Sequence, residues 1–220
     1  PGALSAAAAS AAEAAAATPT RWVLAASACR FCAGFAILVW LPAAMRERFP
    51  TEIESFAVYN SGIKAIAGSA ASLAGGVAAD ALKARGLGDR AGALFCAASS
   101  VAAVPLWYFV LDVSSFETAM GFLLAEYLIA ETWFAPAVAT LQSSVPEERR
   151  GTAQGVFSAL TALGNVLPAA LGLLPPAELT AGLQAAVAAC YALSALGFAG
   201  AAASLPGEDD ARPAEGQRAR

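Results

Sequence analysis

The chain has 220 residues, of which 58% are hydrophobic and only 14% are charged, and its net charge is −4. A soluble domain carries about 25% charged residues, so this composition indicates a membrane protein and excludes nucleic acid as a partner. The alternative is an alanine-rich soluble helical bundle, whose helices need a charged stripe at helical spacing. Residues 179–207 have no charge on any face, which argues against that alternative.

Six apolar stretches follow one another along the chain, each long enough to cross a bilayer core about 30 Å thick. They predict an all-α membrane protein with six transmembrane helices at about residues 22–45, 55–79, 91–111, 118–145, 152–174 and 179–205. The connections between them are short, so residues 21–205 form one bundle without an extramembrane domain. We expect the alanine-rich residues 1–20 to be a disordered linker and the polar residues 206–220 to be a disordered tail.

Basic residues collect in alternate connections. With a cytoplasmic N-terminus, only Arg46 and Arg48 fall outside the membrane, and nine basic residues fall inside: Arg21, Lys83, Arg85, Arg90, Arg149, Arg150, Arg212, Arg218 and Arg220. Positive charge is retained on the cytoplasmic side of membrane proteins. We therefore expect a multi-pass protein with both termini in the cytoplasm.

The connection after the second span reads GGVAADALKARGLGDRAG at 75–92. Gly76 and Asp80 form a G-x-x-x-D pattern; the glycines of this stretch let two helix ends approach closely, and the aspartate can accept hydrogen bonds from a neighbouring helix N-terminus. A dinucleotide loop is disfavoured because no strand precedes the glycines. The second cytoplasmic turn is Glu-Glu-Arg-Arg at 147–150. Together these turns supply the gating-loop candidates Gly76, Asp80, Lys83, Arg85, Arg90, Arg149 and Arg150.

GGVAAD followed by basic residues at the end of the second span resembles the loop motif of the major facilitator superfamily. Trp-Leu-Pro at 40–42, AETWFAPAVATLQSSVPEERRGTAQGV at 130–156 and LGNVLP at 163–168 resemble its spinster-like branch, with asparagine where that branch often has aspartate. The resemblance covers about residues 21–205. It implies the C-terminal half of a twelve-helix fold, a 3+3 inverted repeat, with an N-terminal six-helix half as its partner. It also implies secondary transport.

Polar residues are unevenly distributed among the spans: the first, second and fourth contain Arg30, Lys64, Glu126 and Glu131, and the fifth contains Asn165. A lone charge near the bilayer centre costs about 2.5–3.5 kcal/mol, which favours pairing. Depths at about 1.5 Å per residue predict a Lys64–Glu126 pair and an Arg30–Glu131 pair. We consider all five residues as substrate or coupling candidates. Each pair is a gating contact, a proton site or an anion anchor; static ion pairs and snorkelling side chains are the alternatives.

The chain contains no histidine, which excludes Ser–His and most metal-centred catalysis, so we expect neither an enzyme nor a cofactor. The favoured function is the C-terminal half of a secondary active transporter, which moves a small organic solute or lipid-like anion by alternating access, with proton coupling left open. The alternative is a non-transporting or truncated six-helix subunit that needs a partner. Four cysteines lie inside apolar spans and are interpreted as packing residues: Cys29, Cys32, Cys96 and Cys190.

Overall fold

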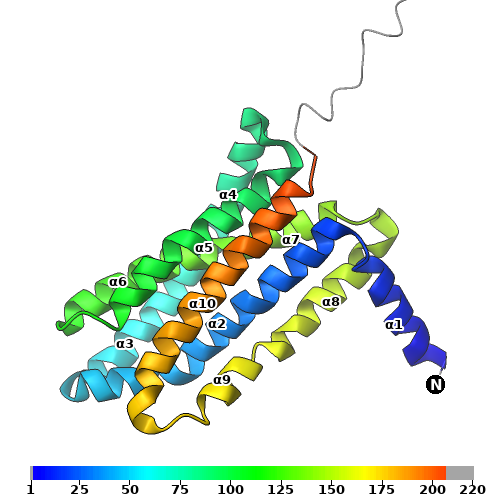
Figure 1. Ribbon diagram of the computed structural model, residues 1–220. Coiled ribbons are helices and arrows are strands. Elements are labelled where there is room, and N and C mark those ends of the chain that lie inside the picture. The colour runs from blue at the N-terminus through cyan, green and yellow to red at the C-terminus, as the bar shows by residue number, and fades with distance from the viewer. Residues whose placement is uncertain (1, 207–220) are drawn as a thin grey trace, which may run out of the picture.

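The computed structural model describes residues 2–206, which form a bundle of long helical rods (Figure 1). The prediction of an all-α membrane fold is confirmed. The α-helices are α1 Gly2–Ala14, α2 Thr18–Arg48, α3 Ile53–Ile63, α4 Ser69–Leu82, α5 Ala91–Val110, α6 Phe116–Ala130, α7 Phe134–Ser143, α8 Arg150–Leu163, α9 Val166–Leu171 and α10 Pro176–Ala203. Short 3₁₀ and π turns join or interrupt them: η1 Pro50–Glu52, η2 Lys64–Gly68, η3 Lys83–Leu87, η4 Gly88–Arg90, η5 Glu131–Trp133 and η6 Glu147–Arg149.

Five continuous helical segments of the described chain are long and apolar enough to cross a membrane. The second, Pro50–Val110, has 61 residues. A straight helix of that length would extend about 90 Å, roughly three times the thickness of the hydrocarbon core. The segment instead folds back at Gly86 and Gly88, whose φ angles are 93° and 61°, a region that suits glycine. Its two arms bring the number of rods that cross the bundle to six.

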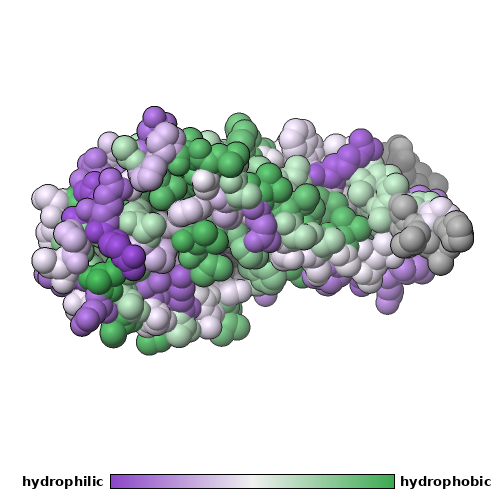
Figure 2. Space-filling view, turned by 90° about the horizontal axis from the view of Figure 1, so that it is seen from below, coloured by the Kyte–Doolittle hydropathy of each residue, from purple (hydrophilic) through white to green (hydrophobic). Residues whose placement is uncertain are grey.

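Large apolar side chains cover the outer sides of the rods. In Figure 2 they form extended green areas, and hydrophilic side chains gather at the end drawn on the left. Several of these apolar side chains are more than two-thirds exposed: Val58, Ile66, Leu73, Val77, Leu173 and Leu196. A soluble monomer rarely leaves so much apolar surface in contact with water, whereas lipid accommodates it.

The interior contains two hydrophobic clusters, one toward each end of the bundle. One is built around Leu41 and Trp107, and the other around Trp133, Phe157 and Phe198. Helix α10 packs along both α2 and α5 and so connects the clusters. On α2 the first cluster begins at Ala33 and the second ends at Ala26, so the buried Arg30 lies at the boundary between them.

The N-terminal segment differs from the expected disordered linker. Residues 2–14 form helix α1, which lies against α8; Ala14 is buried, and the Glu13 carboxylate lies 3.0 Å from Arg149 Nη2. Alanine has the highest helix propensity of all residues, and this outweighs the low complexity of the segment. Of the expected disordered tail, residues 207–220 lie outside the described part of the chain.

Three of the spans are irregular near their middle. The second contains the π turn η2, and the fourth contains the 3₁₀ turn η5, just before Pro136. The fifth breaks at Gly164 and Asn165, between α8 and α9 (Figure 1). Proline has no backbone N–H, so Pro136 and Pro168 remove the hydrogen bonds that would continue the preceding turns. The interruptions of the fourth and fifth spans therefore lie just before Pro136 and Pro168.

Candidate functional site

Four charged residues inside the spans line two adjoining cavities. The larger, of about 270 Å³, is lined by Lys64, Glu126 and Glu131, with Tyr127 and apolar side chains of α2. The smaller, of about 170 Å³, is lined by Arg30 and Glu131. Glu131 belongs to both, together with two residues of α2, Gly34 and Leu38. The structure thus brings together all four charged residues that the sequence singles out within the spans.

Irregular backbone positions two of these side chains. Lys64 is the first residue of the π turn η2, and Glu131 is the first residue of the 3₁₀ turn η5. Turns of both kinds depart from the regular i→i+4 pattern, and π turns inside α-helices are frequent at functional sites. Arg30 and Glu126 come from the regular helices α2 and α6.

Arg30 is 4% exposed and has contacts with backbone and aromatic rings. Its Nη2 donates a hydrogen bond of 2.5 Å to the Ala130 carbonyl, while Nε and Nη1 have no hydrogen-bond partner among the residues that the structure describes. The guanidinium lies 4.3 Å from the ring centroid of Tyr191 and 5.5 Å from that of Trp133. Cation–π contacts contribute about 0.5–2 kcal/mol each, which offsets part of the cost of burying the charge.

The predicted Lys64–Glu126 and Arg30–Glu131 ion pairs are not formed, and this part of the prediction is wrong. Among the described residues, the ion pairs within 4.0 Å join Lys83 to Asp89 and Arg149 to Glu13.

Glu126 is 2% exposed and accepts a hydrogen bond from Tyr191 Oη. The sequence prediction paired only charged residues, by their depth along helices assumed to be straight. It could not reveal Tyr191 as the partner of Glu126, because Tyr191 is uncharged and lies on α10 in the sixth span. A tyrosine in an alanine-rich apolar span was the one signal available, because a buried hydroxyl needs a hydrogen-bond partner.

Asn165 lies apart from the two cavities. It is exposed at the break between α8 and α9, and its Nδ2 donates to the Ala162 carbonyl at 3.4 Å. Helix α2 packs against this break: a Cβ on Gly164 would lie 2.5 Å from the Phe35 ring, and Trp40 Nε1 donates to the Pro168 carbonyl at 2.9 Å. Helix α2, which lines both cavities, therefore also packs against the break between α8 and α9.

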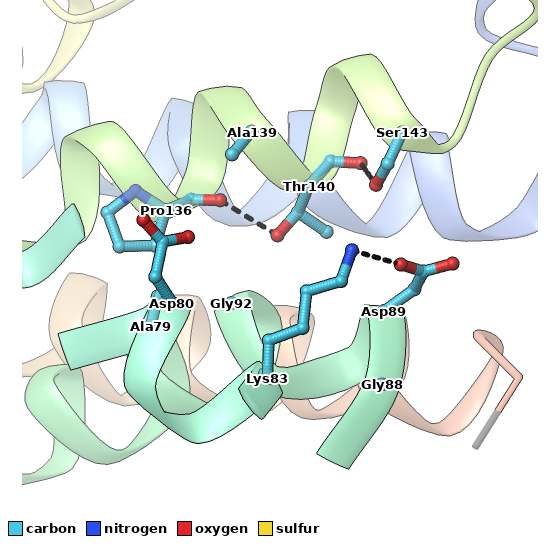
Figure 3. A pocket seen from close by; sticks show the side chains of 11 residues that line it. Ala79, Asp80, Lys83, Gly88, Asp89, Gly92, Pro136, Ala139, Thr140 and Ser143 are labelled. Atoms are coloured by element: carbon cyan, nitrogen blue, oxygen red, sulfur yellow. Dashed lines mark hydrogen bonds and ion pairs between the residues drawn. The ribbon is translucent and has the colours of Figure 1, made fainter. Parts of the chain in front are cut away.

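The gating-loop candidates lie elsewhere, at the end of the bundle where η3 and η4 connect α4 to α5. Asp80, Lys83 and Asp89 line a separate pocket of about 100 Å³ together with Thr140 and Ser143 of α7 (Figure 3). Lys83 Nζ lies 2.7 Å from Asp89 Oδ1, and both side chains are about half exposed. The other basic candidates of this set are exposed: Arg85, Arg90, Arg149 and Arg150.

Close approach between the second and fourth spans depends on Gly75, the neighbour of the candidate Gly76. A Cβ on Gly75 would overlap the backbone carbonyl of Thr132 in η5. On Gly76 the nearest atom would be the Ala135 Cβ at 3.7 Å, an ordinary contact. The G-x-x-x-D pattern therefore directs attention to Gly76, while the contact between spans two and four depends on its neighbour.

Comparison with known proteins gives one family. Residues 3–169 match the sequence model of the Major Facilitator Superfamily. The matched segment covers more than half of the chain and runs from α1 into α9, so it contains both cavities. Searches of the curated proteins and of the solved structures give no match.

Proposed function

The chain belongs to the Major Facilitator Superfamily, and from this premise we propose that it is the C-terminal half of a secondary active transporter of the spinster-like branch. The family makes it an integral, multi-pass membrane protein that takes part in transport. Under the proposal, an N-terminal six-helix half is its partner. The two halves rock against each other and move a small organic solute or lipid-like anion by alternating access, coupled to protons.

One observation supports this function most: four charges lie inside membrane-spanning segments and face shared cavities instead of pairing with one another. Charged residues within spans are rare, and those that face a cavity mark substrate or ion pathways. A merely structural role for these charges would be served by closed ion pairs. A non-transporting subunit therefore explains the unpaired charges less well than a transporter does.

The irregular spans support alternating access. Discontinuous helices near the bilayer midplane are typical of transporter binding sites, where they absorb the movement of one half against the other. Here η2 and η5 each begin with a cavity-lining charge, and the break in the fifth span is packed against α2. We assign the gating movement to these three places, and the closing contacts of the gate to the two turns that contain Lys83 and Arg149, together with Asp80.

The orientation follows from the distribution of basic residues. The start of α2, the connection from α4 to α5, the connection from α7 to α8 and the end of α10 lie at one end of the bundle (Figure 1). This end carries the exposed Arg21, Lys83, Arg85, Arg90, Arg149 and Arg150. Positive charge favours the cytoplasmic side, so we place both termini there.

The test is uptake by proteoliposomes that contain the full-length protein, first with a panel of solutes and then with variants. Glu126→Gln and Glu131→Gln remove the two cavity carboxylates, and Glu117→Gln changes an exposed glutamate at the start of α6 as the matched control. We expect each cavity variant to lose at least tenfold in uptake or to lose its pH dependence, and the control to keep both. Unchanged uptake and unchanged pH dependence in both cavity variants would refute the coupling role.

A further inference from the structure

The larger cavity contains two groups of opposite charge, Lys64 and Glu131, that form no ion pair with any described residue. Lys64 is half-buried, and in the part of the chain that the structure describes its ammonium has neither an ion pair nor a hydrogen bond. Glu131, which also lines this cavity, has no cation of the described residues 2–206 within 4.0 Å. A charged group inside a membrane span is costly without a partner, so each of these groups can gain a partner from a bound solute.

The charges of the two cavities balance. In their ionised forms, Arg30 and Lys64 supply two positive charges, and Glu126 and Glu131 supply two negative ones. A solute with net charge would add an uncompensated charge to a low-dielectric site, where charge interactions are several-fold stronger than in water. A zwitterion adds none, and its two ends can each meet an unpaired group.

We propose that the larger cavity binds a small zwitterion of the amino-acid class, with its carboxylate on Lys64 and its ammonium on Glu131. This inference rests on the proposed function and specifies its solute. Lys64 is the accessible cation, because Arg30 is 4% exposed and bound to the Ala130 carbonyl. Glu131 is the accessible carboxylate, because Glu126 is buried and accepts the Tyr191 hydroxyl.

The size and walls of the cavity agree with such a solute. Its volume of about 270 Å³ is near the lower end of the range of about 300–1,000 Å³ found for small-molecule sites, which suits a solute of amino-acid size. Ile37 and Leu38 give it an apolar wall suited to an aliphatic side chain. Gly34 and Gly68 also line it, and no atom lies within 4 Å of a Cβ built on either, so their missing side chains leave room.

The test is thermal unfolding of the full-length protein in lipid nanodiscs, with each of the twenty standard amino acids as probe. Leucine is then compared with 4-methylpentanoate, which lacks the ammonium, and with 3-methylbutylamine, which lacks the carboxylate. A bound solute stabilises the folded state by RT ln(1 + L/Kd), where L is its free concentration, so the melting temperature rises with its concentration and its affinity. We expect amino acids to raise it by several degrees, and both analogues to bind at least tenfold more weakly than leucine.

Variants then assign the two ends of the solute. Lys64→Gln and Glu131→Gln should each weaken amino-acid binding at least tenfold. The controls Arg46→Gln and Glu117→Gln change exposed residues near the end of α2 and at the start of α6, and should leave binding unchanged. The melting temperature without solute shows whether each variant is folded. Lys64→Arg keeps the positive charge and should retain part of the binding.

Each outcome separates this inference from the proposed function. If no amino acid raises the melting temperature, or if 4-methylpentanoate binds as well as leucine, the zwitterion site is overturned. The proposed transport function is then tested separately, by uptake of anions into proteoliposomes. If amino acids bind with the expected dependence on Lys64 and Glu131 but proteoliposomes take up none of them, the site stands and the transport function fails.

Discussion

Two adjacent glycines of α4 lead to opposite expectations for the same substitution. Alanine at Gly75 places its methyl group on the backbone carbonyl of Thr132, which cannot rotate away as a side chain would. Alanine at Gly76 places its methyl group 3.7 Å from the Ala135 Cβ, in ordinary contact. Gly75→Ala must therefore separate α4 from η5, and Gly76→Ala need move nothing.

The magnitudes decide the sign of each effect. An extra methyl group in a closely packed site costs about 1–3 kcal/mol, and replacing glycine by alanine inside a helix gains about 1 kcal/mol. Gly75→Ala should therefore lower the free energy of unfolding by up to about 2 kcal/mol, since both terms apply. Gly76→Ala should raise it by up to about 1 kcal/mol, because only the helix term applies.

Reversible unfolding in mixed detergent micelles measures both variants against the parent protein. Because η5 begins with Glu131, Gly75→Ala should also disturb the cavity and lower uptake, which Gly76→Ala leaves unchanged. Equal stability of the two variants would refute the close approach of α4 to η5 at Gly75.

Three further substitutions test single contacts by the same unfolding measurement. Tyr191→Phe keeps the ring over Arg30 but removes the hydrogen bond to the Glu126 carboxylate, and should cost about 1.5–3 kcal/mol; no loss would contradict that bond. Trp40→Phe removes the donor to the Pro168 carbonyl and should cost about 0.5–1.5 kcal/mol, and a neutral result would argue against this link between spans one and five. Glu13→Gln breaks an exposed ion pair with Arg149 and should change stability by less than about 1 kcal/mol.

Much of the fold was predictable because it depends on the length of the apolar stretches and on the position of glycines in the turns. The six spans follow from uninterrupted apolar stretches, which a bilayer requires whatever the tertiary contacts. The turn between α4 and α5 lies at Gly86 and Gly88, within the glycine-rich connection of the sequence. Helix α1 was missed because alanine-rich composition is compatible both with a helix and with a linker, and its contact with α8 is not visible in the sequence.

The site was predictable in its members but not in its pairing. The cost of placing a charge inside a membrane span is enough to single out Arg30, Lys64, Glu126 and Glu131, because such residues are rare and mark functional sites. Their partners depend on side-chain direction, which the turns η2 and η5 change and which no straight-helix depth can give. The partner of Glu126 is the neutral Tyr191 of α10 and not a cation, because the packing of α10 brings the tyrosine hydroxyl to the carboxylate.

Alternating access to the charged cavities is the central claim, and Gly34 offers the most direct test of it. Gly34 lines both cavities, and a Cβ there meets no atom within 4 Å, so Gly34→Cys should be tolerated. In full-length protein whose Cys29, Cys32, Cys96 and Cys190 are replaced, a membrane-impermeant maleimide is added to either side of proteoliposomes. We predict labelling at position 34 from both sides. Labelling from one side alone, or from neither, would contradict alternating access.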